Sequence, residues 1–317
     1  MNDYKLAIII PAYKGKYLKE TLQSFQKQTD QRFNLYVGDD CSPDNIEAIF
    51  SEFSHLSNFH YHKFQSNIGK YSLTDQWNRC VDLCQNEQYI WLFGDDDVCD
   101  EICVSKFYEI QKRSKVDLYR FNLKVINDFG DIIIIQAPYP PQESHIEFAR
   151  KRFGNKIISS VNEYIFNKES FINHGRFEKF PLAWCSDDAT WIKLSMKNGI
   201  KTIPEAIVKW RLSEINISSQ PVKHKREIII AIKDYIEWFN NNVINIKLQK
   251  EFYKLEEKWL KNQLFPFKNE LKPIDLLYLS NSFRSYNSLK KSWLYLKLNL
   301  ELFHPKISYL YNKLFCF

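Results

Sequence analysis

The sequence predicts an α/β fold with a Rossmann-like, mostly parallel sheet flanked by helices, followed by an all-helical C-terminal extension. Over the first hundred residues, short apolar runs alternate with amphipathic stretches, and two of the runs end directly in aspartates. After residue 220 the composition shifts to Lys, Leu, Tyr, Trp and Asn without any glycine. We therefore expect two domains, residues 1–219 and residues 220–317.

The first hundred residues predict strands and helices in alternation. Strands are expected at residues 6–10, 33–37, 59–64 and 89–93, and helices at residues 17–28, 46–53 and 71–84. In the first helix, Leu18, Leu22 and Phe25 recur at helical spacing. Alternating strands and helices form parallel sheets, and such sheets bind ligands beyond the carboxyl ends of their strands.

The middle of the chain predicts a less regular region, and the end predicts helices only. Strands are expected at residues 116–122, 161–166 and 207–212, a hairpin from 124–126 and 132–135, a loop at 137–142, and a helix at 188–198 stopped by Gly199. Breaks between the C-terminal helices are expected at Pro266, Pro273 and Pro305.

Composition narrows the class of protein. The chain has 317 residues, 44% of them hydrophobic and 26% charged, which is typical of a protein with a real core. A net charge of +6 is too mild to indicate nucleic-acid binding. The seven cysteines have neither the spacing nor the histidines of a zinc site, and we expect no signal peptide ahead of the first apolar run. We expect reduced thiols and a cytoplasmic protein.

Three acidic clusters are candidates for chemistry. Asp95-Asp96-Asp97 follows a buried strand, and three adjacent carboxylates repel one another unless a cation neutralises them. Mg²⁺ and Mn²⁺ bind one or two carboxylates together with diphosphate oxygens, so a metal could join this cluster to a nucleotide donor. The alternative is a solvated acidic turn that caps the next helix.

The other two clusters have similar pairs of interpretations. Asp39 and Asp40 end the second strand, either as part of an ordinary turn or as a contact to a nucleobase. Asp187 and Asp188 begin a predicted helix, either as favourable charges at its N-terminus or as the general base that takes a proton from an attacking hydroxyl.

Taken together in this order and spacing, these segments resemble glycosyltransferase family 2, whose members are inverting enzymes with the A-type nucleotide-diphospho-sugar transferase fold. The resemblance rests on residues 8–13, 37–44, 67–69 with Asn78, 94–97, 186–188 and 210–218. Lys14 and Ser213 depart from the family pattern, which commonly has Asn and His there.

The resemblance implies roles for individual residues. For the nucleotide donor it implies Pro11, Ala12, Tyr13, Asp40, Asn67, Gly69, Lys70, Asp95, Asp97 and Arg211. Asp40 would bind the base, and Arg211 and Lys70 would add positive charge near the phosphates. Asp96, with Asp97, would hold Mn²⁺ or Mg²⁺, and Asp188, with Asp187, would supply the catalytic base.

The implied function is transfer of a hexosyl or N-acetylhexosaminyl group, with inversion, from a UDP-sugar to a glycan or lipid-linked glycan in surface polysaccharide biosynthesis. Lys290, Lys291, Trp293 and Lys297 suggest a basic amphipathic helix that docks at the inner membrane face; the alternative is a packed helix with solvated lysines. The rival functions are a nucleotidyltransferase and a non-catalytic nucleotide-sugar-binding protein.

Overall fold

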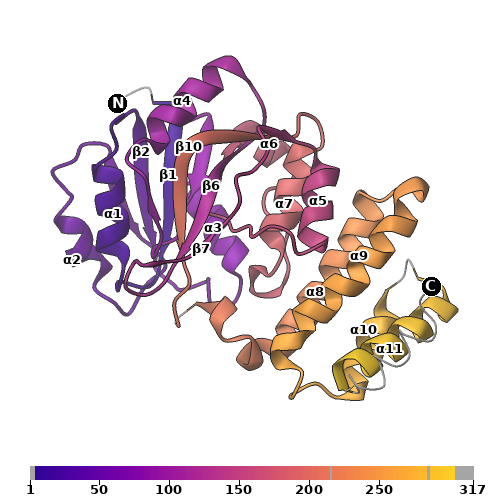
Figure 1. Ribbon diagram of the computed structural model, residues 1–317. Coiled ribbons are helices and arrows are strands. Elements are labelled where there is room, and N and C mark those ends of the chain that lie inside the picture. Colours follow the sequence, from indigo (N-terminus) through magenta and orange to yellow (C-terminus); the bar gives the residue numbers. More distant parts are fainter. Residues whose placement is uncertain (1–3, 215, 284–285, 304–317) are drawn as a thin grey trace. The chain divides into compact units, whose positions relative to one another are not determined.

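The computed structural model describes residues 4–214, 216–283 and 286–303 (Figure 1). The chain falls into two compact units. The larger unit comprises residues 1–149, 157–179 and 186–214, and the smaller one comprises residues 150–156, 180–185 and 215–317. The smaller unit thus includes two segments that precede residue 219, and the division into domains at that residue stays a prediction.

One mixed sheet forms the centre of the larger unit, with the order β3-β2-β1-β4-β9-β6-β10-β5, while β7 pairs with β6 and β8 with β10. Its strands are β1 (Leu6–Ala12), β2 (Phe33–Asp39), β3 (Phe59–Lys63), β4 (Tyr89–Leu92), β5 (Val98–Cys99), β6 (Leu118–Ile126), β7 (Ile132–Ile135), β8 (Gln142–Glu143), β9 (Tyr164–Asn167) and β10 (Ile200–Arg211).

Two strands of this order, β9 and the edge strand β5, run opposite to the rest. Strands β3, β2, β1 and β4 are parallel to their neighbours, as the strand–helix alternation predicts. Strand β9 then runs antiparallel to both β4 and β6, and β6 is again parallel to β10. The α/β class is confirmed, with a sheet that is parallel in its first half and mixed beyond it.

Helices flank the sheet, and their apolar faces form the core with it (Figure 1). They are α1 (Leu18–Gln26), α2 (Ile46–Ser51), α3 (Leu73–Val81), α4 (Cys103–Arg113), α5 (His145–Phe153), α6 (Lys168–Asn173) and α7 (Ser186–Ser195). Leu18, Leu22 and Phe25 are fully buried, which confirms the predicted face of α1. Phe25 packs edge-on against Trp91 and Phe93 of the β4 segment, with ring centroids 5.5 and 4.9 Å apart.

Several elements differ from the predicted ones. The two runs expected at residues 116–122 and 124–126 form one strand, β6, and the loop expected up to Gln142 ends one residue earlier, where β8 begins. Strand β10 begins at Ile200 instead of residue 207, because the chain passes Pro204 through a bulge in which Glu205 has a φ of 68°. Helix α7 ends at Ser195, and Gly199 takes the left-handed conformation that follows it.

The smaller unit is helical. It contains α8 (Lys225–Asn242), α9 (Ile246–Leu264), α10 (Pro273–Ser282) and α11 (Ser288–Phe303) around an aromatic core. Pro266 lies in the turn between α9 and α10, and Pro273 begins α10, so both breaks are confirmed; Pro305 lies outside the described residues. Among the described helices, none has the length and apolarity needed to cross a membrane.

Candidate active site

An acidic turn, residues 94–97, leaves the carboxyl end of β4 and is fixed first to the loop after β1. The Asp95 carboxylate oxygen Oδ2 accepts hydrogen bonds from the backbone N–H groups of Tyr13 and Lys14, both at 2.8 Å. Two motifs that lie about eighty residues apart in sequence are therefore in direct contact. Asp95 thus shapes the loop after β1, which the family resemblance assigns to the nucleotide donor.

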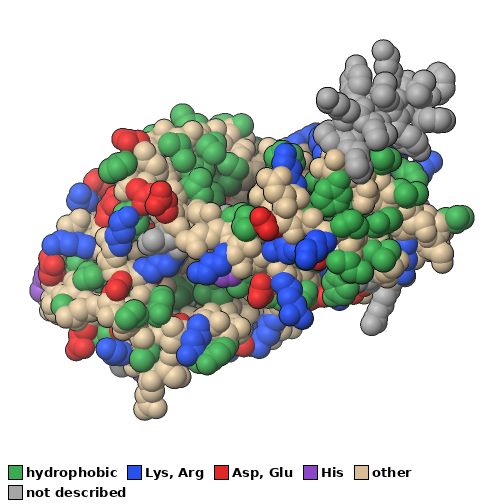
Figure 2. Space-filling model, turned by 90° about the horizontal axis from the view of Figure 1, so that it is seen from below, with side chains coloured by type: hydrophobic (Ala, Val, Ile, Leu, Met, Phe, Trp, Pro, Cys, Tyr) green, Lys and Arg blue, Asp and Glu red, His purple; other side chains and the backbone are tan. Residues whose placement is uncertain are grey.

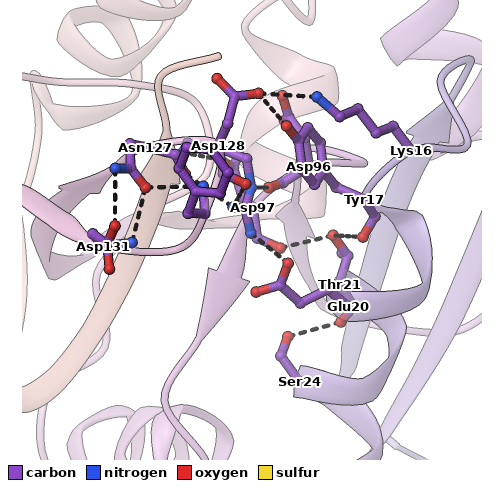
Figure 3. Close-up of polar contacts among 12 residues, drawn as sticks. Lys16, Tyr17, Glu20, Thr21, Ser24, Asp96, Asp97, Asn127, Asp128 and Asp131 are labelled. Carbon is purple, nitrogen blue, oxygen red and sulfur yellow. Dashed lines mark hydrogen bonds and ion pairs between the residues drawn. The ribbon is translucent and has the colours of Figure 1, made fainter.

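The other end of the acidic turn is fixed to α1 and β10 (Figure 3). Oδ1 of the buried Asp97 accepts a hydrogen bond from the Arg211 backbone N–H at 2.7 Å, and the Asp97 carbonyl accepts one from Thr21 Oγ1 at 2.8 Å. A Cβ atom on Gly94 would lie 2.4 Å from Asp97 Oδ2 and 3.1 Å from Asp96 Oδ1. Only glycine leaves room at this position for both carboxylates as the structure has them.

Asp96 differs from its two neighbours in what its carboxylate contacts. Its backbone carbonyl accepts a hydrogen bond from Arg211 Nε at 2.7 Å. Within the described part of the chain, no other residue donates a hydrogen bond to its side-chain oxygens. This carboxylate is only partly buried, so its lone pairs are free for a ligand.

The electrostatics of the acidic turn favour a bound cation. Burial raises the pKa of Asp95, and it raises the pKa of Asp97 well above the ordinary value, with repulsion from Asp96 adding to it. Burial and the charge of Asp95 raise the pKa of Asp96 to about 7. Carboxylate oxygens are ligands that Mg²⁺ and Mn²⁺ prefer, so the residues present fit such an ion. Over residues 4–214, 216–283 and 286–303 no group of three or more His, Cys, Asp or Glu side chains is placed to hold a metal, so other ligands would have to come from a substrate or water.

Arg211 joins three elements around this turn. Its buried guanidinium donates to the Asn127 carbonyl at 3.0 Å, to a Glu20 carboxylate oxygen at 2.6 Å, and lies 4.3 Å from the centre of the Tyr17 ring. These contacts give Arg211 a positioning role for the acidic turn. Its expected contact to the donor phosphates stays a prediction.

The second acidic cluster organises the loop after β3. The carboxylate of the buried Asp40 accepts hydrogen bonds from the backbone N–H groups of Ile68 and Gly69, both at 2.9 Å, and forms an ion pair with Arg79. A Cβ atom on Gly69 would lie 2.4 Å from Asp40 Oδ2, so glycine is needed there as well. Asp40 and Gly69, both predicted to line the donor site, are therefore in direct contact.

The remaining predicted donor residues surround these two clusters. Pro11 and Ala12 are the last residues of β1, and Tyr13 follows them with 40% of its surface exposed. Asn67 Oδ1 accepts a hydrogen bond from the Lys70 backbone N–H at 3.0 Å. The Lys70 side chain is exposed and lies over the Tyr71 ring, so the structure shows it at the surface beside this loop.

The predicted base lies on a separate element. Asp187 and Asp188 are in the first turn of α7, where Asp188 is buried and Asp187 half-buried. Burial, with a smaller contribution from the charge of Asp187, raises the pKa of the nearby Glu163 to about 8. The role of Asp188 in proton transfer stays a prediction.

Sequence reasoning missed the side chains that hold the predicted ones in place. Arg79 pairs with Asp40, Glu20 pairs with Arg211, and Asp128 accepts a hydrogen bond from the Tyr17 hydroxyl. Arg79 directly follows Asn78, one of the residues that carry the family resemblance, and that position was the only signal for it. The other two had none, because each looks like an ordinary surface acid.

The mixed sheet flanked by helices is an A-type glycosyltransferase fold, and comparison with known proteins gives the class of glycosyltransferases. The model described as "Glycosyl transferase family 2" matches residues 7–171, more than half of the chain. The chain therefore belongs to glycosyl transferase family 2, which confirms the resemblance seen in its motifs.

Two relatives of known name are similar to the chain. A UDP-Glc:α-D-GlcNAc-diphosphoundecaprenol β-1,3-glucosyltransferase, WfgD of Escherichia coli, is 24% identical over 245 residues, which cover 75% of this chain and 88% of the relative. The glycosyltransferase GlyG of Streptococcus pneumoniae serotype 4 is 23% identical over 188 residues, covering 55% of this chain and 62% of the relative.

Solved structures share the fold. Residues 1–349 of S. aureus TarS, crystallised with UDP-GlcNAc, align with a TM-score of 0.66 at 16% identity, covering 96% of this chain and 88% of that one. GalNAc-T7 with UDP, GalNAc and Mn²⁺ aligns with a TM-score of 0.51 at 11% identity, covering 75% of this chain and 48% of that one. At these identities the likeness establishes the A-type fold alone.

Proposed function

We propose that the chain transfers a hexosyl or N-acetylhexosaminyl group from a UDP-sugar, with inversion, to a hydroxyl of a lipid-linked glycan during surface polysaccharide synthesis. The observation that carries the proposal is the acidic turn, which contacts the β1 loop through Asp95 and the end of β10 through Asp97. One short segment thereby brings together the parts expected to hold base, sugar and diphosphate. The relative WfgD is named for the transfer of glucose from UDP-Glc to GlcNAc-diphosphoundecaprenol. That name supports the choice of a UDP-sugar as donor and a lipid-linked glycan as acceptor.

In this proposal Asp96, assisted by Asp97, holds Mn²⁺ or Mg²⁺. The open carboxylate of Asp96 and the raised pKa values of all three aspartates support that assignment. Such an ion, when bound with the donor, stabilises the negative charge on the departing diphosphate. The chain itself orients the sugar with Asp95 and keeps the turn rigid through Arg211, and Asp40 holds the loop at the base.

We assign to Asp188 the role of general base, which takes the proton of the attacking hydroxyl, with Asp187 beside it. A base on the acceptor side allows a single displacement, which inverts the anomeric centre. Residues 1–219 would carry these steps, and residues 220–317 would form an accessory region. In this proposal the protein works in the cytoplasm at the inner face of the membrane, where the lipid-linked acceptor is embedded.

An apolar stripe on α10 and α11 of the accessory region is the observation that supports the proposed membrane association. Ile274, Leu277 and Tyr278 of α10, and Leu289, Trp293 and Leu296 of α11, are 40–83% exposed and recur at helical spacing. On the part of the molecule that holds α10 and α11, at the right of Figures 1 and 2, Figure 2 shows hydrophobic and cationic side chains intermixed. Two predicted lysines are engaged within the unit, because Lys297 pairs with Glu257 at 3.0 Å and Lys290 packs on Tyr286.

Transfer to a defined acceptor tests the proposed function. Purified protein with Mn²⁺ and a panel of UDP-sugars is offered GlcNAc-α-diphosphate linked to a lipid, and the product linkage is read by NMR. We expect that one UDP-sugar of the panel gives a product and that the anomeric configuration of this product is inverted. Retained configuration would contradict the single displacement, and binding of UDP without any turnover of donor would indicate the non-catalytic protein instead.

Vesicle flotation tests the membrane part separately. The intact chain is expected to float with anionic vesicles, and Trp293→Glu is expected to stay in the soluble fraction because a charge in the apolar stripe opposes insertion. Tyr71→Glu is the control, because Tyr71 is an aromatic of the larger unit that is even more exposed than Trp293, 81% against 42%. Equal flotation of both variants and the wild type would contradict a role for α11.

A further inference from the structure

Strand β7 is an exposed, wholly apolar strand. Its side chains Ile132, Ile133, Ile134 and Ile135 are 47, 48, 42 and 69% exposed, and Phe129 in the adjoining turn is 89% exposed. Isolated exposed apolar residues are common, but a contiguous run on a strand is typical of a binding surface and is otherwise an aggregation risk. We therefore looked to an apolar ligand as the molecule that covers this strand.

The pairing pattern places β7 at the crevice. Strand β10 pairs along the whole of β6, so it occupies one edge of β6, and β9 and β7 must share the other edge. Strand β9 takes residues 118–120 of β6 and also pairs with β4, whereas β7 takes residues 124–126. Strand β7 thus lies beyond the carboxyl end of β4, where the acidic turn begins.

The hairpin turn is also tied to the acidic turn by hydrogen bonds. Arg211 donates to the Asn127 and Asp128 carbonyls at 3.0 and 3.4 Å and to the Asp96 carbonyl at 2.7 Å. One side chain therefore fixes the β6–β7 turn and the acidic turn at a set separation. A molecule bound on β7 would therefore lie next to the acidic turn, where the reaction is proposed to take place.

A cation accompanies the apolar strand. Lys124 is directly opposite Ile135 in the antiparallel pair, and directly opposite residues share a face of the sheet. Its neighbour in register on β10, Lys209, is paired with Asp100 at 3.0 Å. Lys124 is half-buried, and among the residues described no carboxylate forms an ion pair with it. An uncompensated ammonium beside isoleucines suits a hydrocarbon chain that is attached to a phosphate.

We propose that β7 and Lys124 bind the lipid-phosphate part of the acceptor, with the isoleucines against the first units of a prenyl chain and Lys124 at its phosphate. This inference rests on the proposed function, because it concerns the acceptor of that reaction. The bilayer surface is a poorer occupant, since the exposed carboxylate of Asp131 at the hairpin tip is repelled by anionic headgroups. A second copy pairing with β7 would cover the approach to the acidic turn.

Direct binding of a prenyl phosphate tests the inference without requiring turnover. Fluorescently labelled farnesyl phosphate is titrated with the full chain in EDTA, so that a metal-loaded donor site does not contribute. The wild type is expected to bind, and Ile132→Thr/Ile135→Thr is expected to bind roughly tenfold more weakly. These two isoleucines are opposite Ile126 and Lys124, on the face that carries Lys124, and the variant loses their apolar contact area while keeping strand propensity. Lys124→Gln is expected to weaken farnesyl phosphate but not farnesol. Ile172→Thr, at an equally exposed position on α6, is the control.

Each other outcome has a definite meaning. Equal affinity of the wild type and both variants, or no binding by the wild type, would overturn the inference. A wild-type dimer that the isoleucine variant dissociates would overturn it in favour of a second copy. If the double variant fails to fold, Lys124→Gln alone decides. Release of UDP from the donor, measured in parallel, reports separately on the proposed function, which can fail while the lipid site stands.

Discussion

Replacing Gly94 by alanine should separate the geometry of the acidic turn from its charge. The new Cβ would lie 2.4 Å from Asp97 Oδ2, whereas ordinary contact begins at 3.4 Å. The Asp97 carboxylate must therefore move away by about 1 Å, because its oxygen Oδ2 is the atom that the new Cβ would overlap. No aspartate is removed and no charge is changed.

Two losses follow from that displacement. The 2.7 Å hydrogen bond from the Arg211 backbone N–H to Asp97 Oδ1 breaks, and a hydrogen bond to a charged group contributes about 2 kcal/mol to the free energy of unfolding. A misplacement of about 1 Å in a catalytic assembly lowers turnover roughly 100-fold. We expect Gly94→Ala to lose that much kcat for donor turnover, with a thermal midpoint lower by several degrees.

The assay is release of UDP from the preferred donor, measured beside thermal unfolding of the same preparation. Gly175→Ala is the control, because its Cβ meets no atom within 4 Å although its φ of 80° strains any residue with a side chain. The control should therefore lose stability without losing turnover. Wild-type turnover in Gly94→Ala would refute the reasoning that the turn must hold Asp96 and Asp97 in this arrangement.

Three further predictions use other parts of the structure. Asp96→Asn should abolish metal-stimulated UDP release while leaving the thermal midpoint in the absence of metal unchanged or higher, since one of three repelling carboxylates is removed; a lower midpoint would contradict this. Gly69→Ala should weaken UDP binding about tenfold by calorimetry, because its Cβ would displace the Asp40 carboxylate, and unchanged affinity would argue against Asp40 at the base. Burial raises the pKa of Glu256 to about 7, so the folded protein binds a proton that the unfolded chain has released above its own pKa near 4.5. The free energy of unfolding should therefore fall between about pH 5 and pH 8, and Glu256→Gln should remove that part of the slope measured by urea unfolding.

The residues of the acidic turn could be predicted because a simple pattern marks them. Asp95, Asp96 and Asp97 follow an apolar strand without a break, and parallel sheets bring strand ends to one edge. The pairs that support them could not be predicted. Arg79 and Asp40 are 39 residues apart, and Glu20 and Arg211 are 191 apart, so their contacts depend on the tertiary fold alone.

The elements that sequence reasoning missed have weak local signals. Strands β5 and β8 have two residues each, which is too short for any periodicity to register. Helix α5 carries Arg150, Lys151 and Arg152 in its last turn, and its few apolar residues did not stand out. In β10, the strand was expected only from residue 207, whereas it begins at Ile200 and continues past Pro204 through a bulge.

The central claim is that Asp96 holds the metal with which this family member turns over a UDP-sugar. The most direct measurement is UDP release with Mn²⁺, with and without EDTA, for the wild type, Asp96→Asn and Asp188→Asn. The account predicts release by the wild type that EDTA abolishes, none from Asp96→Asn at any metal concentration, and a loss of transfer in Asp188→Asn with donor binding intact. Release that persists in EDTA, or equals the wild type in Asp96→Asn, would contradict it.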